Sequence, residues 1–410
     1  IDAVALDPHH GAGRHLASGA DKLLFIEGRQ EGVGIEIEVV NGASRRGGAL
    51  GLNPLVASYG PALLDRAILD ALGKATGQSF ARMIAANVPG IAATDLTPDI
   101  EAEHLKSFLA GLKAAPTIDV RHTVGLVDPL TAADRPAAER VNDGLPETLE
   151  EVVAYYSGRY YKLKVGGDIR TDLDRLSRIA SVLDKGAKDY RCTFDGNEQY
   201  DDVDGIVELW RKVEETPALA KMVKSTLFIE QPIKRQAALS RPVTALAKYR
   251  PVIIDESDGE LSTFPLALKL GYAGVSTKNC KGFYKSILNA ARVAKLGAGH
   301  FMSAEDLTTQ PGVSVQQDLA LVSLLGLTHV ERNAHHFIDG MSAAPESEQQ
   351  AFLAAHPNLY ERHPGHPVRL KARSGKLDLS SLGCPGFAVG ADMDFKSLKP
   401  MPEAPKERLQ

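Results

Sequence analysis

Short apolar runs alternate with longer amphipathic stretches through the middle of the chain. Between these runs, most stretches place apolar residues at helical spacing, as residues 172–183 and 286–296 do. Repeated strand–helix units imply parallel strands, and eight of them predict a closed (β/α)8 barrel. The eight runs, which are rich in β-branched and aromatic residues, cover residues 117–124, 160–165, 190–195, 226–230, 251–255, 274–278, 300–304 and 328–331.

A doubly wound open sheet is the alternative interpretation of the same pattern. That fold binds dinucleotides through a glycine-rich turn after its first strand. Residues 125–129 follow the first predicted strand here and read Gly-Leu-Val-Asp-Pro, which supplies no such turn. The pattern therefore favours the barrel.

The two ends of the chain show a different pattern of apolar and polar residues from the middle. Residues 22–40 predict two strands joined by a turn, and residues 61–76 carry apolar positions at helical spacing. The tail returns to short strand-like pieces, for example over residues 367–379, and we expect it to fold back onto the N-terminal unit. We therefore divide the chain into an N-terminal α+β unit, a barrel and a C-terminal segment, with bounds 1–116, 117–345 and 346–410.

Composition narrows the classes of partner. The 410 residues are 44% hydrophobic and 24% charged, with a formal net charge of −5 and no basic tract, which argues against nucleic-acid or membrane-surface binding. Three separated cysteines and the lack of a long apolar run favour a cytoplasmic protein with reduced thiols. Because the sequence begins at Ile1, a removed leader remains open. We expect a homo-oligomer that acts on a small molecule.

Charged residues stand where five consecutive predicted strands end. Lys162 and Lys164 share one face of the second strand, which would point them into the barrel. Buried ammonium and carboxylate groups are costly unless they are paired. Three oxygen ligands without Cys or His suit Mg²⁺ better than Zn²⁺. The next three strands end in the predicted metal ligands Asp195, Glu230 and Asp255, and the sixth ends in Lys278.

This arrangement predicts proton transfer beside a carboxylate. Strands two and six lie on opposite sides of a ring of eight, so Lys164 and Lys278 would face each other across the lumen. A carboxylate bound to the metal would then hold its α-carbon between two amines, while the metal stabilises the enediolate. One lysine would remove the α-proton and the other would return one on the opposite face. We expect Asn197 and Glu305 to contact the substrate.

Each of these groups also has a simpler interpretation. A single Asp or Glu at a strand end is more often a helix cap or an ion-pair partner, and Lys-Leu-Lys alone is common on exposed strands. Five successive strands that end this way make chance less plausible than a site. The histidines at 300, 329, 335 and 336 are more readily interpreted as structural than as substrate contacts, and residues 7–15, with three histidines, as a solvated loop.

The strand-end set resembles the enolase superfamily, specifically its muconate lactonizing enzyme subgroup. The resemblance implies an α+β capping domain over a (β/α)7β modified TIM barrel, with Mg²⁺ bound by Asp195, Glu230 and Asp255. It also implies that Lys164 and Lys278 are the acid/base pair and that Lys162 assists at the substrate carboxylate. The motifs that carry it are Lys162-Leu-Lys164, Asp195-Gly-Asn197, Glu230-Gln-Pro, Asp255-Glu256-Ser, Lys278 and the ending Gly383-Cys-Pro-Gly-Phe.

Two departures leave the reaction open. Lys278 is followed by Asn-Cys-Lys-Gly where the subgroup has a pair of glycines, and strand eight ends Glu331-Arg-Asn where its dipeptide epimerases have Asp-x-Asp. The sequence therefore predicts an isomerase, with racemisation, epimerisation or cycloisomerisation ahead. The alternatives are an acid-sugar dehydratase that uses the same site and a metal-binding barrel with a non-catalytic role.

Overall fold

The structure is a computed structural model that describes residues 51–305, 311–332 and 339–397. The strands predicted within residues 22–40, the histidine-containing loop at 7–15 and the histidines at 335 and 336 lie outside the described residues. Within the described part of the chain, no helix is long and apolar enough to span a membrane.

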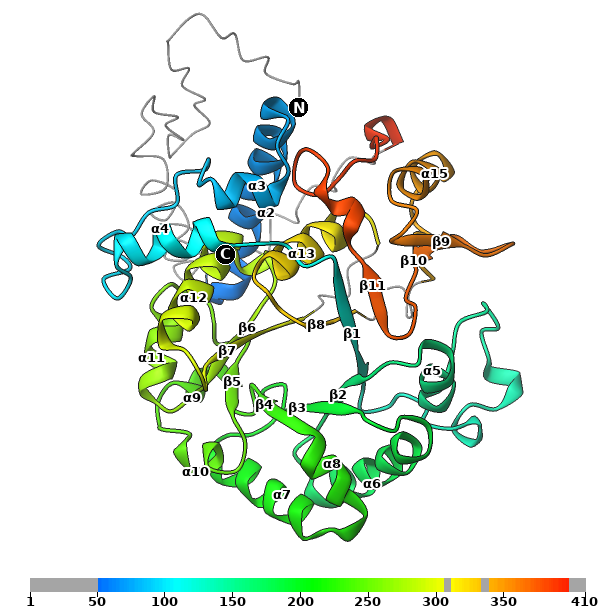
Figure 1. The fold of residues 1–410 in the computed structure, drawn as a ribbon. Helices are drawn as coiled ribbons and strands as arrows, with labels where there is room; N and C mark the ends of the chain where they lie inside the picture. The colour runs from blue at the N-terminus through cyan, green and yellow to red at the C-terminus, as the bar shows by residue number, and fades with distance from the viewer. Residues whose placement is uncertain (1–50, 306–310, 333–338, 398–410) are drawn as a thin grey trace, which may run out of the picture.

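The centre of the molecule is a parallel barrel (Figure 1). Strands β1 to β7 pair in sequence order, and β8 pairs with β1 on its other side. Since β8 also lies beside β7, the strands close into a ring, which confirms the predicted barrel and excludes the open doubly wound sheet. The strands are β1 (Thr117–Val124), β2 (Tyr160–Lys164), β3 (Arg191–Asp195), β4 (Thr226–Glu230), β5 (Val252–Ile254), β6 (Gly274–Thr277), β7 (Phe301–Ala304) and β8 (His329–Glu331).

Helices cover the outside of the barrel. In β2, Tyr161 and Leu163 belong to the apolar layer under the helices, whereas Lys162 between them is buried on the inner side. The alternation of outward apolar and inward polar residues is thus the one that the sequence predicted. The covering helices are α5 (Leu149–Tyr156), α6 (Ile169–Gly186), α7 (Val203–Glu215), α8 (Ala220–Ser225), α9 (Arg235–Ala238), α10 (Thr244–Ala247), α11 (Thr263–Lys269), α12 (Phe283–Leu296) and α13 (Val313–Leu324).

Strand register brings the ends of neighbouring strands to one level. Lys164 is the register partner of Asp195, and Asp195 is the register partner of Glu230. Thr277 pairs with Ala304, so Lys278 and Glu305 follow at matching positions. Parallel strands all end at the same rim, and functional side chains of a barrel come from that rim.

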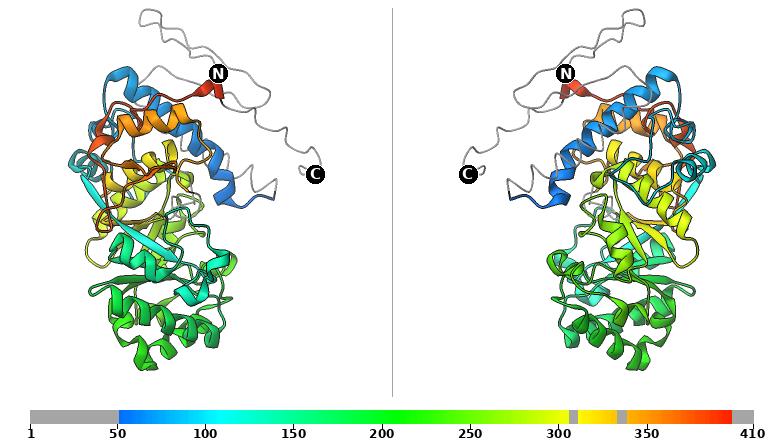
Figure 2. Two further views of the ribbon diagram at one scale, coloured as in Figure 1. Left: turned by 90° about the vertical axis from the view of Figure 1, so that its right-hand side faces the viewer. Right: turned by 90° about the vertical axis from the view of Figure 1, so that its left-hand side faces the viewer.

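The N-terminal helices α2 (Pro54–Thr76), α3 (Phe80–Ala85) and α4 (Ala102–Gly111) lie with the tail at one end of the molecule (Figure 2). Asn53 caps α2 by accepting a hydrogen bond from the backbone N–H of Val56, so the helix begins seven residues before the predicted start. The predicted range was the stretch from Pro61 that carries apolar residues at helical spacing. In the structure Pro61 lies inside the helix.

The tail contacts these helices directly. The backbone N–H of Phe387 donates to Asp70 Oδ1 at 2.9 Å, and the Phe387 ring stacks on Phe80 with centroids 4.0 Å apart. The division of the chain at 116 and 345 stays a prediction. The elements of the tail are α15 (Glu346–Ala355), β9 (Tyr360–Arg362), β10 (Val368–Leu370) and β11 (Lys376–Asp378); β11 runs antiparallel along the start of β1.

The contact between α2 and the tail leaves no room for a side chain at Gly73. A Cβ there would lie 2.6 Å from Cα of Gly386 and 2.8 Å from Cε of Met83. We expect Gly73→Ala to lower the free energy of unfolding by about 1–3 kcal/mol through overpacking, measured by urea denaturation. Gly111 is the exposed last residue of α4, and a Cβ added there would meet nothing within 4 Å, so Gly111→Ala should be neutral or add up to about 1 kcal/mol. Equal losses in both variants would contradict this account.

Candidate active site

Lys162 is the centre of an ion-pair network inside the barrel. Its side chain is fully buried. Burial alone would lower the pKa of Lys162, but the surrounding carboxylates raise it well above its ordinary value. This ammonium is therefore the internal counter-ion of the site. Its Nζ lies 2.9 Å from Asp195 Oδ2, 3.1 Å from Glu230 Oε2, 2.9 Å from Glu305 Oε2 and 3.1 Å from Glu331 Oε2.

The other two predicted lysines belong to strands four apart in the ring. Lys164 ends β2, donates to Asp195 Oδ2 and donates to Asn197 Oδ1 at 2.9 Å. Lys278 follows β6, lies 3.3 Å from Asp255 Oδ2 and contacts Glu305 Oε1. Lys164 is partly exposed, with 20% of its side chain accessible, and Lys278 is buried. Each lysine is therefore tied to carboxylates in the structure.

Three buried carboxylates form a compact acidic group. Glu230, Asp255 and Glu305 each offer an oxygen, and these oxygens all lie within 4.8 Å of one another. Oε1 of Glu230 is buried and has no hydrogen-bond partner among the described residues, which is unusual for a buried polar atom unless a further ligand satisfies it. An all-oxygen donor set of this kind fits Mg²⁺.

Two of the three predicted metal ligands, Glu230 and Asp255, belong to this acidic group. Asp195 lies outside it and is paired with Lys162 and Lys164. Burial alone would raise the pKa of Asp195, but the two ammonium groups hold it below its ordinary value. Glu305 is the third member of the group, and its predicted contact with the substrate stays a prediction.

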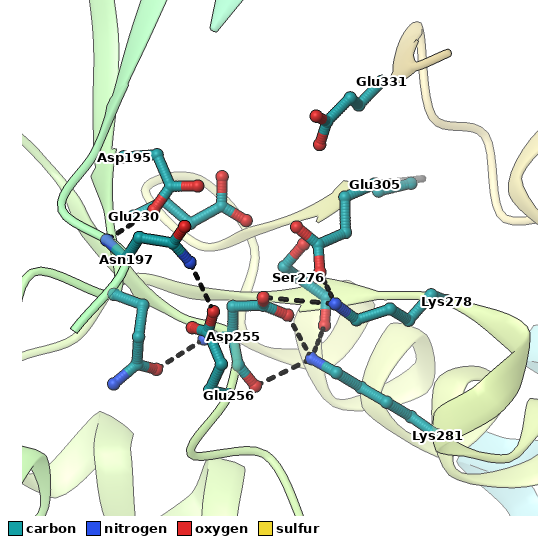
Figure 3. A network of polar contacts seen from close by, with 12 residues as sticks. Asp195, Asn197, Glu230, Asp255, Glu256, Ser276, Lys278, Lys281, Glu305 and Glu331 are labelled. Atoms are coloured by element: carbon teal, nitrogen blue, oxygen red, sulfur yellow. Dashed lines mark hydrogen bonds and ion pairs between the residues drawn. The ribbon is translucent and has the colours of Figure 1, made fainter. Parts of the chain in front are cut away.

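Asp255 is held from several directions (Figure 3). Its backbone N–H donates to Oε1 of Gln231 at 2.8 Å, and Gln231 also accepts from the N–H of Ser257. Lys278 approaches one carboxylate oxygen of Asp255, and Lys281 donates to the other. Burial opposes ionisation, yet these lysines hold the pKa of Asp255 well below its ordinary value.

Sequence reasoning did not assign a role to three residues of this network: Glu256, Lys281 and Glu331. Glu256 accepts from Asn197 Nδ2 at 2.7 Å, and burial together with Asp255 and Asp195 raises the pKa of Glu256 to about 7. Glu331 is the last residue of the eighth predicted strand, and its place at a strand end was the available signal. Lys281 lies in the segment that departs from the glycine pair.

Two of the four histidines considered from the sequence, His300 and His329, lie in the described residues. Nδ1 of His329 lies 2.6 Å from Nη1 of Arg121, and the His329 ring stacks on Tyr160 with centroids 4.3 Å apart. Burial and Arg121 lower the pKa of His329 to about 3. His300 lines a cavity of about 390 Å³ together with Phe108 and residues at the start of β7 and β8. The structural role expected for these histidines stays a prediction.

The third metal ligand is open to a direct test. Asp195 and Glu305 are each paired with two lysines, so ion pairing does not decide between them, but Asp195 is the register partner of the ligand candidate Glu230. We expect Asp195→Asn to weaken Mg²⁺ binding about 100-fold or more, and Glu305→Gln to weaken it less than about tenfold. Isothermal titration calorimetry with Mg²⁺ measures both. The reverse order would assign the metal to Glu230, Asp255 and Glu305, and unchanged affinity in Asp195→Asn would exclude it as a ligand.

No family model matches the sequence, and no curated protein sequence matches it. Solved structures do. A mandelate racemase/muconate lactonizing protein from Paracoccus denitrificans PD1222, complexed with magnesium, is similar over 88% of this chain and 79% of its own, with a TM-score of 0.57 and 16% identity. The muconate lactonizing enzyme of Pseudomonas putida is similar over 87% of this chain and 78% of its own, with a TM-score of 0.52 and 17% identity. An enolase from Streptomyces coelicolor, solved without magnesium, is similar over 87% of this chain and 74% of its own, with a TM-score of 0.53 and 17% identity.

At this level of identity the similarity shows the fold. The chain has the modified TIM-barrel fold of mandelate racemase/muconate lactonizing proteins, and this confirms the resemblance read from the strand ends.

Proposed function

We propose that this chain, which has the fold of the enolase superfamily, is a Mg²⁺-dependent enzyme that removes a proton from the carbon next to a carboxylate. The observation that carries the proposal is a buried acidic group at the barrel rim with a lysine on each side. Glu230 and Asp255 belong to that group, Lys164 comes from β2, and Lys278 follows β6. Racemisation, epimerisation or cycloisomerisation of a small carboxylate is the reaction class that uses this arrangement best.

The metal would be held by Glu230 and Asp255 together with Asp195 or Glu305. Their hard oxygen donors suit Mg²⁺, and Oε1 of Glu230, which bonds no described residue, is a ligand atom that the metal could use. When bound, Mg²⁺ supplies electrostatic stabilisation of the negative charge that develops on the substrate carboxylate as the α-proton leaves.

The two lysines would carry the proton. One neutral amine removes the α-proton from one face of the substrate, and the ammonium on the opposite wall delivers a proton to the other face. In the structure Lys164 donates to Asp195 and Lys278 donates to Asp255, and both carboxylates are candidate metal ligands. Metal binding and release of the lysines are therefore coupled, because the same oxygens serve both. Asn197, which bonds Lys164, would orient that amine or contact the substrate.

Deuterium exchange tests this function without knowledge of the substrate. The protein is incubated in D₂O with Mg²⁺ and a library of small α-protonated carboxylates, and wash-in at the α-carbon is followed by NMR or mass spectrometry. We expect exchange for at least one compound class and its loss on chelation of the metal. Loss of water from an acid sugar would assign the dehydratase alternative. No exchange across a broad library would leave the non-catalytic binding role ahead.

A further inference from the structure

The segment after β6 sends a second buried lysine to the loop that follows β5. Residues Asn279–Lys281 form a short 3-10 turn, η4, and place Lys281 beside Asp255. Only 1% of Lys281 is accessible. Its Nζ donates to Oδ1 of Asp255, to the backbone O of Asp255 at 2.8 Å and to the backbone O of Ser276 at 2.9 Å (Figure 3). All three N–H groups of the ammonium are therefore used.

The two carboxylate oxygens of Asp255 consequently differ. Oδ1 is engaged by Lys281, whose remaining bonds go to rigid backbone carbonyls. Oδ2 lies 3.3 Å from Nζ of Lys278, which also contacts Glu305 of the acidic group. Gln231 also accepts from the backbone N–H of Asp255, so both the backbone and the carboxylate of this residue are held.

We propose that Lys281 is a positioning residue that keeps Oδ1 of Asp255 occupied, so that Asp255 offers a metal one oxygen and the site favours Mg²⁺ over Ca²⁺. Mg²⁺ demands near-octahedral geometry with few protein ligands. Ca²⁺ accepts more oxygen ligands and often binds both oxygens of one carboxylate. The inference rests on the proposed function in that it takes Asp255 to be a metal ligand. It does not depend on whether Asp195 or Glu305 completes the set.

Lys285 provides a matched control in the same segment. It is also buried, donates to the backbone O of Asp258 and lies 3.2 Å from Asp258 Oδ2. Asp258 belongs to the same loop, since its N–H donates to the backbone O of Asp255 at 2.9 Å. Lys285 thus stabilises this loop with a buried ammonium, but no contact between it and the Asp255 side chain is seen in the described structure.

The test compares the dissociation constants of Mg²⁺ and Ca²⁺ by isothermal titration calorimetry. Loss of a nearby positive charge strengthens binding of both dications, so it cancels in the ratio of the two constants. We expect Lys281→Met to shift this ratio toward Ca²⁺ by about tenfold, the size typical of changes behind a metal ligand. Lys285→Met should leave the ratio unchanged. An unchanged ratio in Lys281→Met, or an equal shift in both variants, would overturn the proposal.

A structure of the parent chain with Mg²⁺ gives a second test that does not depend on how the variants fold. We expect Oδ1 of Asp255 to remain bonded to Lys281 and away from the ion. Direct coordination by Oδ1, with Lys281 displaced, would overturn the proposal. The two proposals also fail separately: a shifted ratio in a chain that exchanges no α-proton contradicts only the proposed function, and an unshifted ratio in an exchanging chain contradicts only the role of Lys281. A parent chain that binds neither cation contradicts both.

Discussion

Lys162→Met is expected to lower the free energy of unfolding by about 3–5 kcal/mol at neutral pH, because it leaves buried carboxylates without their shared ammonium. Four carboxylate oxygens lie within 3.1 Å of Lys162 Nζ, and the side chain is fully buried. Removal of one partner from a buried ion pair costs far more than the pair contributes over an apolar replacement. Urea denaturation of parent and variant at pH 7 measures the difference.

The pH dependence of this loss has a definite sign. In the parent, Lys162 helps hold the pKa values of Asp195 and Glu331 below their ordinary values, so these groups contribute stability above about pH 4 that is lost as the pH falls. In the variant the same carboxylates lack that ammonium and would take up protons in the folded state. The stability gap between parent and variant should therefore narrow between pH 7 and about pH 4.

An exposed ion pair supplies the control. Lys234 pairs with Asp201, and about half of its side chain is accessible. Lys234→Met should change the free energy of unfolding by no more than about 1 kcal/mol at either pH. If Lys162→Met were as mild as this, or if its effect grew toward acid pH, the network would not be the counter-ion arrangement described above.

Loss of either Lys164 or Lys278 is expected to reduce turnover strongly while leaving α-proton exchange for one of the two stereoisomers. With a substrate found by the deuterium screen, Lys164→Ala and Lys278→Ala should each reduce racemisation or epimerisation by about 10²–10⁴-fold, the usual contribution of a positioned acid or base. Each variant should still exchange the α-proton of one stereoisomer, because the remaining lysine faces only one side of the α-carbon. The two variants should differ in which stereoisomer they retain.

Separate incubation of each stereoisomer in D₂O measures this selectivity. Lys212→Ala is a suitable control because Lys212 is half-exposed on α7 and pairs with Glu215. It should exchange both stereoisomers at the parent rate. Loss of both stereoisomers in both variants would contradict a division of labour between two faces, and retention of full turnover would remove these lysines from the proton path.

Strand positions were predictable because β-branched runs on a buried barrel carry a strong local signal. The inward placement of Lys162 followed from alternation with Tyr161 and Leu163 and needed no tertiary information. Which carboxylates lie together was harder to predict from the sequence. Glu305 and Asp195 both end strands, and which of them joins Glu230 and Asp255 depends on side-chain direction and on competing lysines rather than on spacing.

Lys281 shows where sequence reasoning stops. It lies in a 3-10 turn that has neither the period of a strand nor that of a helix, so no pattern indicates its direction. Only the packing of η4 beside the loop after β5 brings its ammonium to Asp255. The start of α2 was also misplaced, because the helix begins after the cap at Asn53 and continues through Pro61.

The spacing of the buried lysines after β6 also gives a sequence pattern by which other chains could be classified. Lys278, Lys281 and Lys285 are spaced so that one continuous segment of eight residues reaches Asp255 twice and Asp258 once. A residue inserted or deleted between Lys278 and Lys281 would misplace both later lysines, and one between Lys281 and Lys285 would misplace Lys285. We therefore expect such a segment to diverge by substitution rather than by changes in length. Lys-x2-Lys-x3-Lys after a barrel strand would then separate proteins with this constrained Asp from those with the glycine pair.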